Sequence, residues 1–189
     1  MKKLIFVFAV AGFVAITTAF TPLNGKLVSK IGHISFFSHT AVEDITANNY
    51  KVVSTIDPSS GEVVFSVPMQ SFEFEKAKMQ QHYNSPKFLD TKAYPKAKFK
   101  GNITNLGDID FSKDGIYNVN VSGELTIHGV TNPATEKGTI TVKGNKVIVD
   151  TKMMLTLEDY EIAFKNGKPS TNISKTIEIT VKVEFDLEN

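Results

Sequence analysis

The sequence predicts an all-β domain: an antiparallel, eight-stranded barrel with one short helix alongside. Apolar and polar residues alternate with period two along most of the chain, and clusters of turn-forming residues separate the alternating segments. One segment in the first half of the chain carries helix formers instead. About eight strands that each bury one face favour a closed barrel, because closure removes exposed edges, although a two-sheet sandwich fits the same pattern.

The alternation is clearest in SKTIEITVKVEFDLEN near the C-terminus, where aliphatic residues and phenylalanine share one face and threonine and charged residues share the other. Similar alternation predicts strands within 61–70, 96–106, 115–129 and 145–160, and shorter ones at 31–37, 50–56 and 139–143. Turn-forming clusters occur at 57–61, 112–115, 143–145 and 165–170.

The helical segment reads SFEFEKAKMQQHYNSPKF and has no β-branched residue from 72 to 83. Ser71 is suited to cap the helix, and Glu73 and Glu75 suit its first turn. Pro86 marks the end. The segment therefore predicts one helix, or two short turns, beside the sheet.

The N-terminus reads MKKLIFVFAVAGFVAITTAF, in which two lysines precede an apolar run at residues 4–16 and small residues follow. This arrangement is typical of a secretory signal peptide. A permanent anchor is disfavoured because the run is short of the roughly 20 residues that span a bilayer. We expect a signal peptide at 1–19, one domain at 20–189, a periplasmic or secreted location, and no stable membrane insertion once the leader is removed.

Charge and cysteine content exclude several classes of protein. The 189 residues carry a formal net charge of +1, and loss of Lys2 and Lys3 with the leader leaves 19 basic and 20 acidic residues. A nearly neutral domain gives no electrostatic basis for binding nucleic acid. Because the chain has no cysteine, no disulfide supports the fold, which depends on its hydrophobic core.

Large, soft apolar side chains lie at inward-facing positions of the predicted strands, drawn from 14 phenylalanines, 5 tyrosines and 5 methionines. A closed barrel of eight strands either packs solid or holds one apolar ligand, and a tunnel lined in this way suits a long-chain lipid. The predicted ligand-binding residues are Phe65, Val67, Met69, Phe72, Met79, Tyr83, Phe88, Phe99, Tyr117, Leu125, Ile127, Met153, Leu155 and Ile179.

Motifs for catalysis or metal binding are missing from the sequence. It has no cysteine nucleophile, G-x-S-x-G elbow, H-E-x-x-H pair or glycine-rich phosphate loop. We therefore expect no catalytic residue, no metal site and no cofactor other than a bound lipid. The alternative is an enzyme that uses His33, His39 or His82 with Glu43 or Asp44. A third hypothesis is a surface or stress-related interaction protein whose barrel is packed solid.

His128 lies in the stretch GELTIHGVTNPAT. It follows Ile127, which has the inward parity, so we expect His128 to face solvent at the end of a strand. Gly129 then begins a corner that Asn132 and Pro133 complete. This predicts a structural role for His128, not a catalytic one.

The same stretch resembles the G-x-L-T-(I/L)-x-G-V-T hallmark of the YceI-like, polyisoprenoid-binding family. Upstream, MQQHYNSPKFLDTKAYPKAKFKG is similar to that family's short helix followed by F-(F/L)-D, Y-P and A-x-F, in the same order and spacing. The resemblance covers roughly residues 31–187. It implies a lipocalin-like barrel, an apolar tunnel for an isoprenoid or fatty amphiphile, export from the cytoplasm, and a homodimer as one possible assembly.

The sequence departs from the family pattern at one point. His82 matches the family's helix histidine, but the arginine that often accompanies it is missing. Polar contacts to a ligand head group therefore do not carry over from the family, whereas the apolar tunnel does. The expected function is an exported lipid-binding protein that transports, stores or scavenges a long-chain amphiphile.

Overall fold

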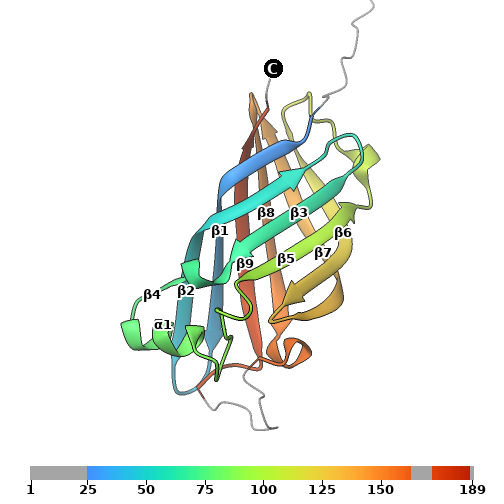
Figure 1. Cartoon of the computed structure of the whole chain (residues 1–189). Helices are drawn as coiled ribbons and strands as arrows, with labels where there is room; N and C mark the ends of the chain where they lie inside the picture. Colours follow the sequence, from blue (N-terminus) through green and yellow to red (C-terminus); the bar gives the residue numbers. More distant parts are fainter. Residues whose placement is uncertain (1–24, 163–171, 188–189) are drawn as a thin grey trace, which may run out of the picture.

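Residues 25–162 and 172–187 are described by the computed structural model, so the predicted signal peptide and the turn at 165–170 lie outside the described residues. Eight long antiparallel strands close into a barrel, which confirms the predicted fold class (Figure 1). They are β1 (Leu27–His39), β2 (Asp44–Ile56), β3 (Glu62–Pro68), β5 (Lys96–Ile103), β6 (Gly115–Ile127), β7 (Val130–Lys143), β8 (Lys146–Thr156) and β9 (Thr176–Asp186). The order around the barrel is β1-β9-β8-β7-β6-β5-β3-β2, and pairing of β1 with β2 closes it.

The remaining elements are short. They are β4 (Glu73–Phe74), the helix α1 (Ala77–Asn84) and the 3-10 turns η1 (Met69–Ser71), η2 (Leu106–Asp108) and η3 (Leu157–Tyr160). Figure 1 shows α1 and β4 beside the end of the barrel at which β9 begins. Within the described ranges, no helix is long and apolar enough to cross a membrane.

The helix begins later than the sequence predicts. Ser71 belongs to η1, and the residue at the N-cap of α1 is Lys76, which makes no side-chain capping bond. Phe72 and Phe74 follow strand alternation instead, and their rings lie 5.7 Å and 4.9 Å from the ring of Tyr83. Packing of these aromatic rings therefore overrides the local helix preference, and the predicted cap at Ser71 is wrong.

Strands β1 and β2 are longer than predicted because irregular pairing hides their alternation. The β1–β2 register shifts between Ser29 and Gly32 and again between Gly32 and Ile34. Each shift changes the face on which the following side chains lie. The apolar pattern of these strands is therefore readable only in part from the sequence.

Strand β7 is also longer than predicted, because its first half is largely polar. It pairs with β6 along its whole length, from Ile127–Val130 to Gly115–Val142. Asn132 and Pro133 lie inside this ladder, so the predicted turn at these residues is wrong. On its other side β7 pairs with β8 only from Gly138 onward. At 130–137 the turn η3 lies beside it, and Asn132 Nδ2 donates to the Asp159 carbonyl at 2.6 Å.

One end of the barrel holds the most deeply buried apolar side chains of its strands. The apolar side chains with the least exposure gather where β8 begins and β9 ends, and neighbouring strands pair two of them directly, Val147 and Phe185. The fully buried members are Val52, Ile56, Ile140, Val147, Val183 and Phe185. We call this the closed end.

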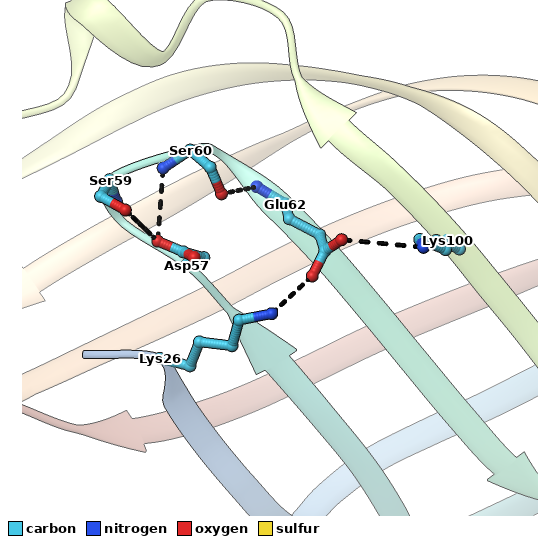
Figure 2. A network of polar contacts seen from close by, with 6 residues as sticks. All are labelled: Lys26, Asp57, Ser59, Ser60, Glu62 and Lys100. Carbon is cyan, nitrogen blue, oxygen red and sulfur yellow. Dashed lines mark hydrogen bonds and ion pairs between the residues drawn. The ribbon is translucent and has the colours of Figure 1, made fainter.

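Polar contacts near the closed end join the start of β1 to β3 and β5 (Figure 2). Lys26 Nζ lies 2.7 Å from Glu62 Oε1, and Lys100 Nζ lies 3.8 Å from Glu62 Oε2. The hydrogen bond from Lys26 lowers the pKa of the Glu62 carboxyl. In the β2–β3 turn, Asp57 Oδ1 accepts from the Ser59 hydroxyl at 2.6 Å and from the Ser59 amide at 2.9 Å. These bonds lower the pKa of Asp57.

Candidate functional site

The end of the barrel opposite the closed end is hollow. A cavity of about 420 Å³ lies between α1 with its following loop and the interior faces of β1, β8 and β9. Among its lining residues are Phe36, Met79, Leu155, Leu157 and Ile177. We call it the outer cavity. Its volume lies within the range of about 300–1,000 Å³ that is typical of small-molecule sites, so the barrel is not packed solid.

A second cavity of about 170 Å³ lies deeper in the barrel and is called the inner cavity. Ile56 and Ile140 of the closed end form part of its wall. Ile127 and Ile179 line both cavities, so their side chains lie between the two. The outer cavity and the inner cavity are thus neighbours within the barrel.

Twelve of the fourteen predicted ligand-binding residues line these cavities. Those of the inner cavity are Phe65, Val67, Phe99, Leu125 and Met153; those of the outer cavity are Met69, Met79, Tyr83, Phe88 and Leu155; Ile127 and Ile179 line both. Phe72 and Tyr117 line neither. Phe72 is buried against Phe36 and Tyr83, and the Tyr117 hydroxyl donates to the Lys113 carbonyl at 2.9 Å. Contact of any of these residues with a ligand stays a prediction.

Tyr83 holds α1 against the barrel. Its ring contacts Phe36 of β1 at 6.1 Å and Phe88 of the following loop at 6.5 Å, in addition to the two rings described above. The residue is 5% exposed, and its hydroxyl oxygen is buried without a hydrogen-bond partner in the part of the chain that the structure describes. Burial raises the pKa of this hydroxyl well above its usual value, so the group stays neutral.

Glu136 is a cavity residue that the sequence analysis missed. It lies on β7 with the same parity as the buried Ile140 and Val142, and it lines the inner cavity. Partial burial raises the pKa of its carboxyl. Continuing the inward parity of Ile140 toward the start of β7 predicts Glu136 as an inward residue. The strand was not predicted there because this half of β7 is largely polar.

The histidines named for the alternative enzyme hypothesis do not converge. His33 Nε2 lies 3.0 Å from Asn48 Oδ1, and its ring stacks on Tyr50, whereas His39 Nδ1 lies 2.6 Å from Asp44 Oδ1 on the exposed surface. His82 is exposed beside the outer cavity. Glu43 pairs with Lys76 at 3.1 Å instead of with a histidine. The described residues contain no group of three or more His, Cys, Asp or Glu side chains that could hold a metal ion.

His128 is a turn residue and not the outward strand residue that the sequence predicts. His128 and Gly129 form the two-residue connection of the β6–β7 hairpin, with φ of 52° and 80°. Positive φ at both positions is characteristic of the type I′ hairpin turn. The ring of His128 packs on Tyr94 at 4.6 Å, and its Nδ1 lies 3.3 Å from the Tyr160 carbonyl. Its role is structural, as predicted, but in the turn.

Comparison with known proteins places this barrel among proteins of one family. The chain is 28% identical over 162 residues to a UPF0312 protein of Pseudomonas putida strain W619, which covers 82% of this chain and 77% of the relative. A polyisoprenoid-binding domain from Saccharophagus degradans, implicated in plant cell wall breakdown, has a similar structure, with a TM-score of 0.72 and 14% identity over 86% of this chain and 98% of that one.

A second solved structure with the same fold is BcnA of Burkholderia cenocepacia, with a TM-score of 0.68 and 18% identity over 81% of this chain and 95% of that one. At such identities the structures show the shared fold alone. The family model described as the YceI-like domain matches residues 19–185, which confirms the resemblance carried by the two sequence blocks. The chain therefore belongs to the YceI-like domain family.

Proposed function

We propose that this protein is an exported lipid-binding protein that holds an isoprenoid or another long-chain amphiphile inside the barrel. The outer cavity carries the proposal, because it is large enough for a ligand, apolar over most of its wall, and adjacent to the inner cavity, with which it shares two lining residues. The chain of such a ligand would extend from α1 past Ile127 and Ile179 toward the closed end.

The chemistry of the wall favours a hydrocarbon chain over a polar solute. Each methylene removed from water contributes roughly 0.8 kcal/mol to binding. A polar group beside Phe65, Phe99 or Met153 would lose its hydrogen bonds to water without replacement. The polyisoprenoid-binding domain from Saccharophagus degradans, which shares the fold, supports the same ligand class for this chain.

The proposal also includes export of the protein and transport or storage of its lipid outside the cytoplasm. The lysine-led apolar run at residues 1–19 supports delivery to the periplasm or the exterior. There a water-soluble barrel would transport, store or scavenge its lipid, with no catalytic step. The homodimer stays a prediction that light scattering of the purified protein would test.

Mass spectrometry of the bound material tests the proposal directly. The mature protein is purified from its natural compartment and extracted with organic solvent, and the extract is compared with that of an unrelated exported protein of similar size. We expect a long-chain lipid in stoichiometric amount. A protein that carries no lipid and also takes up neither polyprenyl nor fatty-acyl probes would contradict the proposal.

A further inference from the structure

Two irregularities in the pairing of β1 with β2 place additional side chains on the outer surface of the barrel. At the first, Lys30 and Ile31 of β1 together lie opposite Val53 of β2. At the second, Tyr50 and Lys51 of β2 together lie opposite a single residue of β1. Two residues opposite one define a β-bulge. Each bulge exposes one lysine beside one large apolar or aromatic side chain, with Ile31 75% and Tyr50 54% exposed.

The exposed apolar side chains of this region lie near one another. Val53 is exposed opposite Ile31, and Val28 is exposed three residues before Ile31 on the same strand. The ring of Tyr50 stacks on that of His33, with centroids 4.6 Å apart. Side chains on the outer face add nothing to the core, and a group of large apolar ones on a surface marks a site of interaction. We call these residues the exposed cluster.

The wall that carries the exposed cluster is also basic. Strands β1, β2, β3 and β5 are consecutive around the barrel and lie side by side in Figure 1. Residues 27–39, 45–56, 63–68 and 96–103 of these strands contain five lysines and no aspartate or glutamate. All five lysines are exposed: Lys30, Lys51, Lys96, Lys98 and Lys100. We call the outer side of these four strands the basic face.

Acidic residues border the basic face, at strand ends or on the neighbouring elements: Asp44, Asp57, Glu62, Glu73, Glu124, Glu178 and Glu184. Glu62 is already paired with Lys26 and Lys100. The other lysines of the basic face form no ion pair within residues 25–162 and 172–187: Lys30, Lys51, Lys96 and Lys98. The nearly neutral net charge of the chain therefore conceals one wall with unpaired positive charge.

We infer that the basic face docks the barrel reversibly on a lipid bilayer that contains anionic lipids. Anionic headgroups attract unpaired lysines. Ile31 and Tyr50 then enter the boundary between headgroups and acyl chains, where tyrosine rings and the stems of lysines are favoured. This contact goes beyond the proposed function, because it assigns a partner to the outside of the barrel whatever the cavities hold.

The composition of the face favours a bilayer over two other occupants. A soluble polyanion would pair with the lysines but would leave the exposed cluster in water. A second copy in a symmetric dimer would bring the same surface against itself, so that lysines would face lysines. An anionic bilayer complements both the charge and the apolar side chains.

Co-sedimentation with large unilamellar vesicles tests the inference, using protein purified from its natural compartment. One set of vesicles is phosphatidylcholine alone, and the other also contains phosphatidylglycerol. We expect binding to the anionic vesicles only, and less of it as the salt concentration rises. Lys30→Gln combined with Lys51→Gln should weaken binding about twentyfold, since each lysine beside an anionic leaflet contributes about fivefold. Ile31→Ser should weaken it about tenfold, because an apolar side chain no longer enters the bilayer.

Two variants outside the basic face are matched controls. Ile116→Ser removes an isoleucine of β6 that is 74% exposed, nearly the same fraction as Ile31. Lys113→Gln combined with Lys143→Gln removes the same charge from exposed positions outside the four strands. Both controls should bind anionic vesicles as the wild type does. Losses equal to those of the basic-face variants would overturn the inference.

The remaining outcomes separate the bilayer from the other occupants. Binding that depends on the lysines but not on Ile31 would show a contact with polyanions through charge alone. A dimer that Ile31→Ser dissociates in light scattering, with vesicle binding unchanged, would show that the face binds a second copy. Either result, or no vesicle binding at all, would overturn the inference. Uptake of a fluorescent apolar probe from solution should be equal in every variant, and its absence in the wild type would instead contradict the proposed function.

Discussion

Gly123, the first glycine of the family motif, is required because two strands approach closely. It lies opposite Gly101 on β5. A Cβ atom at Gly123 would overlap the Lys100 carbonyl and the Gly101 backbone, and one at Gly101 would lie 2.5 Å from the Ser122 carbonyl. Backbone atoms cannot rotate away as a side chain does. The glycine pair therefore sets how closely β5 and β6 pack beside the inner cavity.

Gly123→Ala should consequently destabilise the protein by about 2 kcal/mol, because the strands must separate to admit the methyl group. Chemical denaturation measures the change. Gly107→Ala is the control, since a Cβ there meets nothing within 4 Å. If both variants lose the same stability, the effect comes from backbone freedom and not from close packing.

Met153 and Met154 are neighbours that test the register of β8. Met153 lines the inner cavity, whereas Met154 is 62% exposed on the outer face. Met153→Lys should lower the free energy of unfolding by about 2–4 kcal/mol and abolish lipid uptake, since it puts a charged group in place of an apolar one in the wall of the inner cavity. Met154→Lys should change stability by less than about 0.5 kcal/mol. Similar losses in both variants would show that the inward face is wrongly assigned.

Glu136 gives the stability of the protein a defined pH dependence. Because burial raises the pKa of this carboxyl in the folded state, its protonation favours folding. This contribution is complete below the ordinary value of 4.5 and is lost as pH rises through the higher folded-state value. At neutral pH, Glu136→Gln should therefore be more stable than the wild type, by less than about 1 kcal/mol because the carboxyl is partly hydrated.

Melting temperatures measured between pH 7 and pH 4 check this expectation, and the gain of Glu136→Gln should shrink toward the acid end. Glu124→Gln on the neighbouring strand is the control, because Glu124 is exposed. If the stability gain of Glu136→Gln over the wild type instead grows as the pH falls, the folded protein stabilises the ionised Glu136 carboxylate, contrary to this expectation.

At the scale of elements, the β6–β7 hairpin depends on its two-residue turn. A Cβ at Gly129 would lie 2.6 Å from Tyr94 Cε1, whereas one at Gly144, which also has positive φ, meets nothing within 4 Å. In both variants alanine must adopt a left-handed backbone conformation, but only at Gly129 does the added methyl group also clash with Tyr94. Gly129→Ala should therefore cost about 1 kcal/mol more than Gly144→Ala in thermal denaturation. Equal costs would mean that Tyr94 moves aside freely.

Elements with regular alternation were predictable, and the others failed for identifiable reasons. Strand β9 alternates without interruption, and its observed bounds, Thr176–Asp186, fall inside the predicted segment. The first half of β7 was missed because threonine, asparagine, proline and charged residues conceal its parity. The start of the helix was predicted too early because Phe72 and Phe74 pack on Tyr83. Local helix propensity does not include such contacts between residues about ten positions apart.

At the scale of the whole molecule, the barrel has a closed end and a hollow end, and we expect a ligand to bind at the hollow end. A ligand that binds the folded state alone stabilises it by about 2.7 kcal/mol at one hundred times its Kd. The melting temperature should rise with the logarithm of probe concentration, as followed by circular dichroism. A melting temperature independent of every lipid probe would contradict a ligand-binding barrel.

Parity predicted which side chains face the interior, but it did not separate solid core from cavity wall. Tyr117 and Met153 both lie at inward positions, yet only Met153 borders a cavity. The difference depends on how far apart opposite strands are and on where α1 covers the barrel. Both quantities are set by the three-dimensional arrangement of the closed barrel, so the sequence of a single strand does not predict them.

The incomplete pairing of β7 with β8 leaves a local edge in the wall of the barrel. Residues 130–137 pair with β6 alone, and Pro133, which has no amide hydrogen to donate, lies within this stretch. Amide hydrogens that point away from β6 here should exchange with deuterated water sooner than those of residues 178–182 in β9, which are paired on both sides. The first half of β7 is thus an edge within the wall of the barrel, which the turn η3 covers in place of a strand.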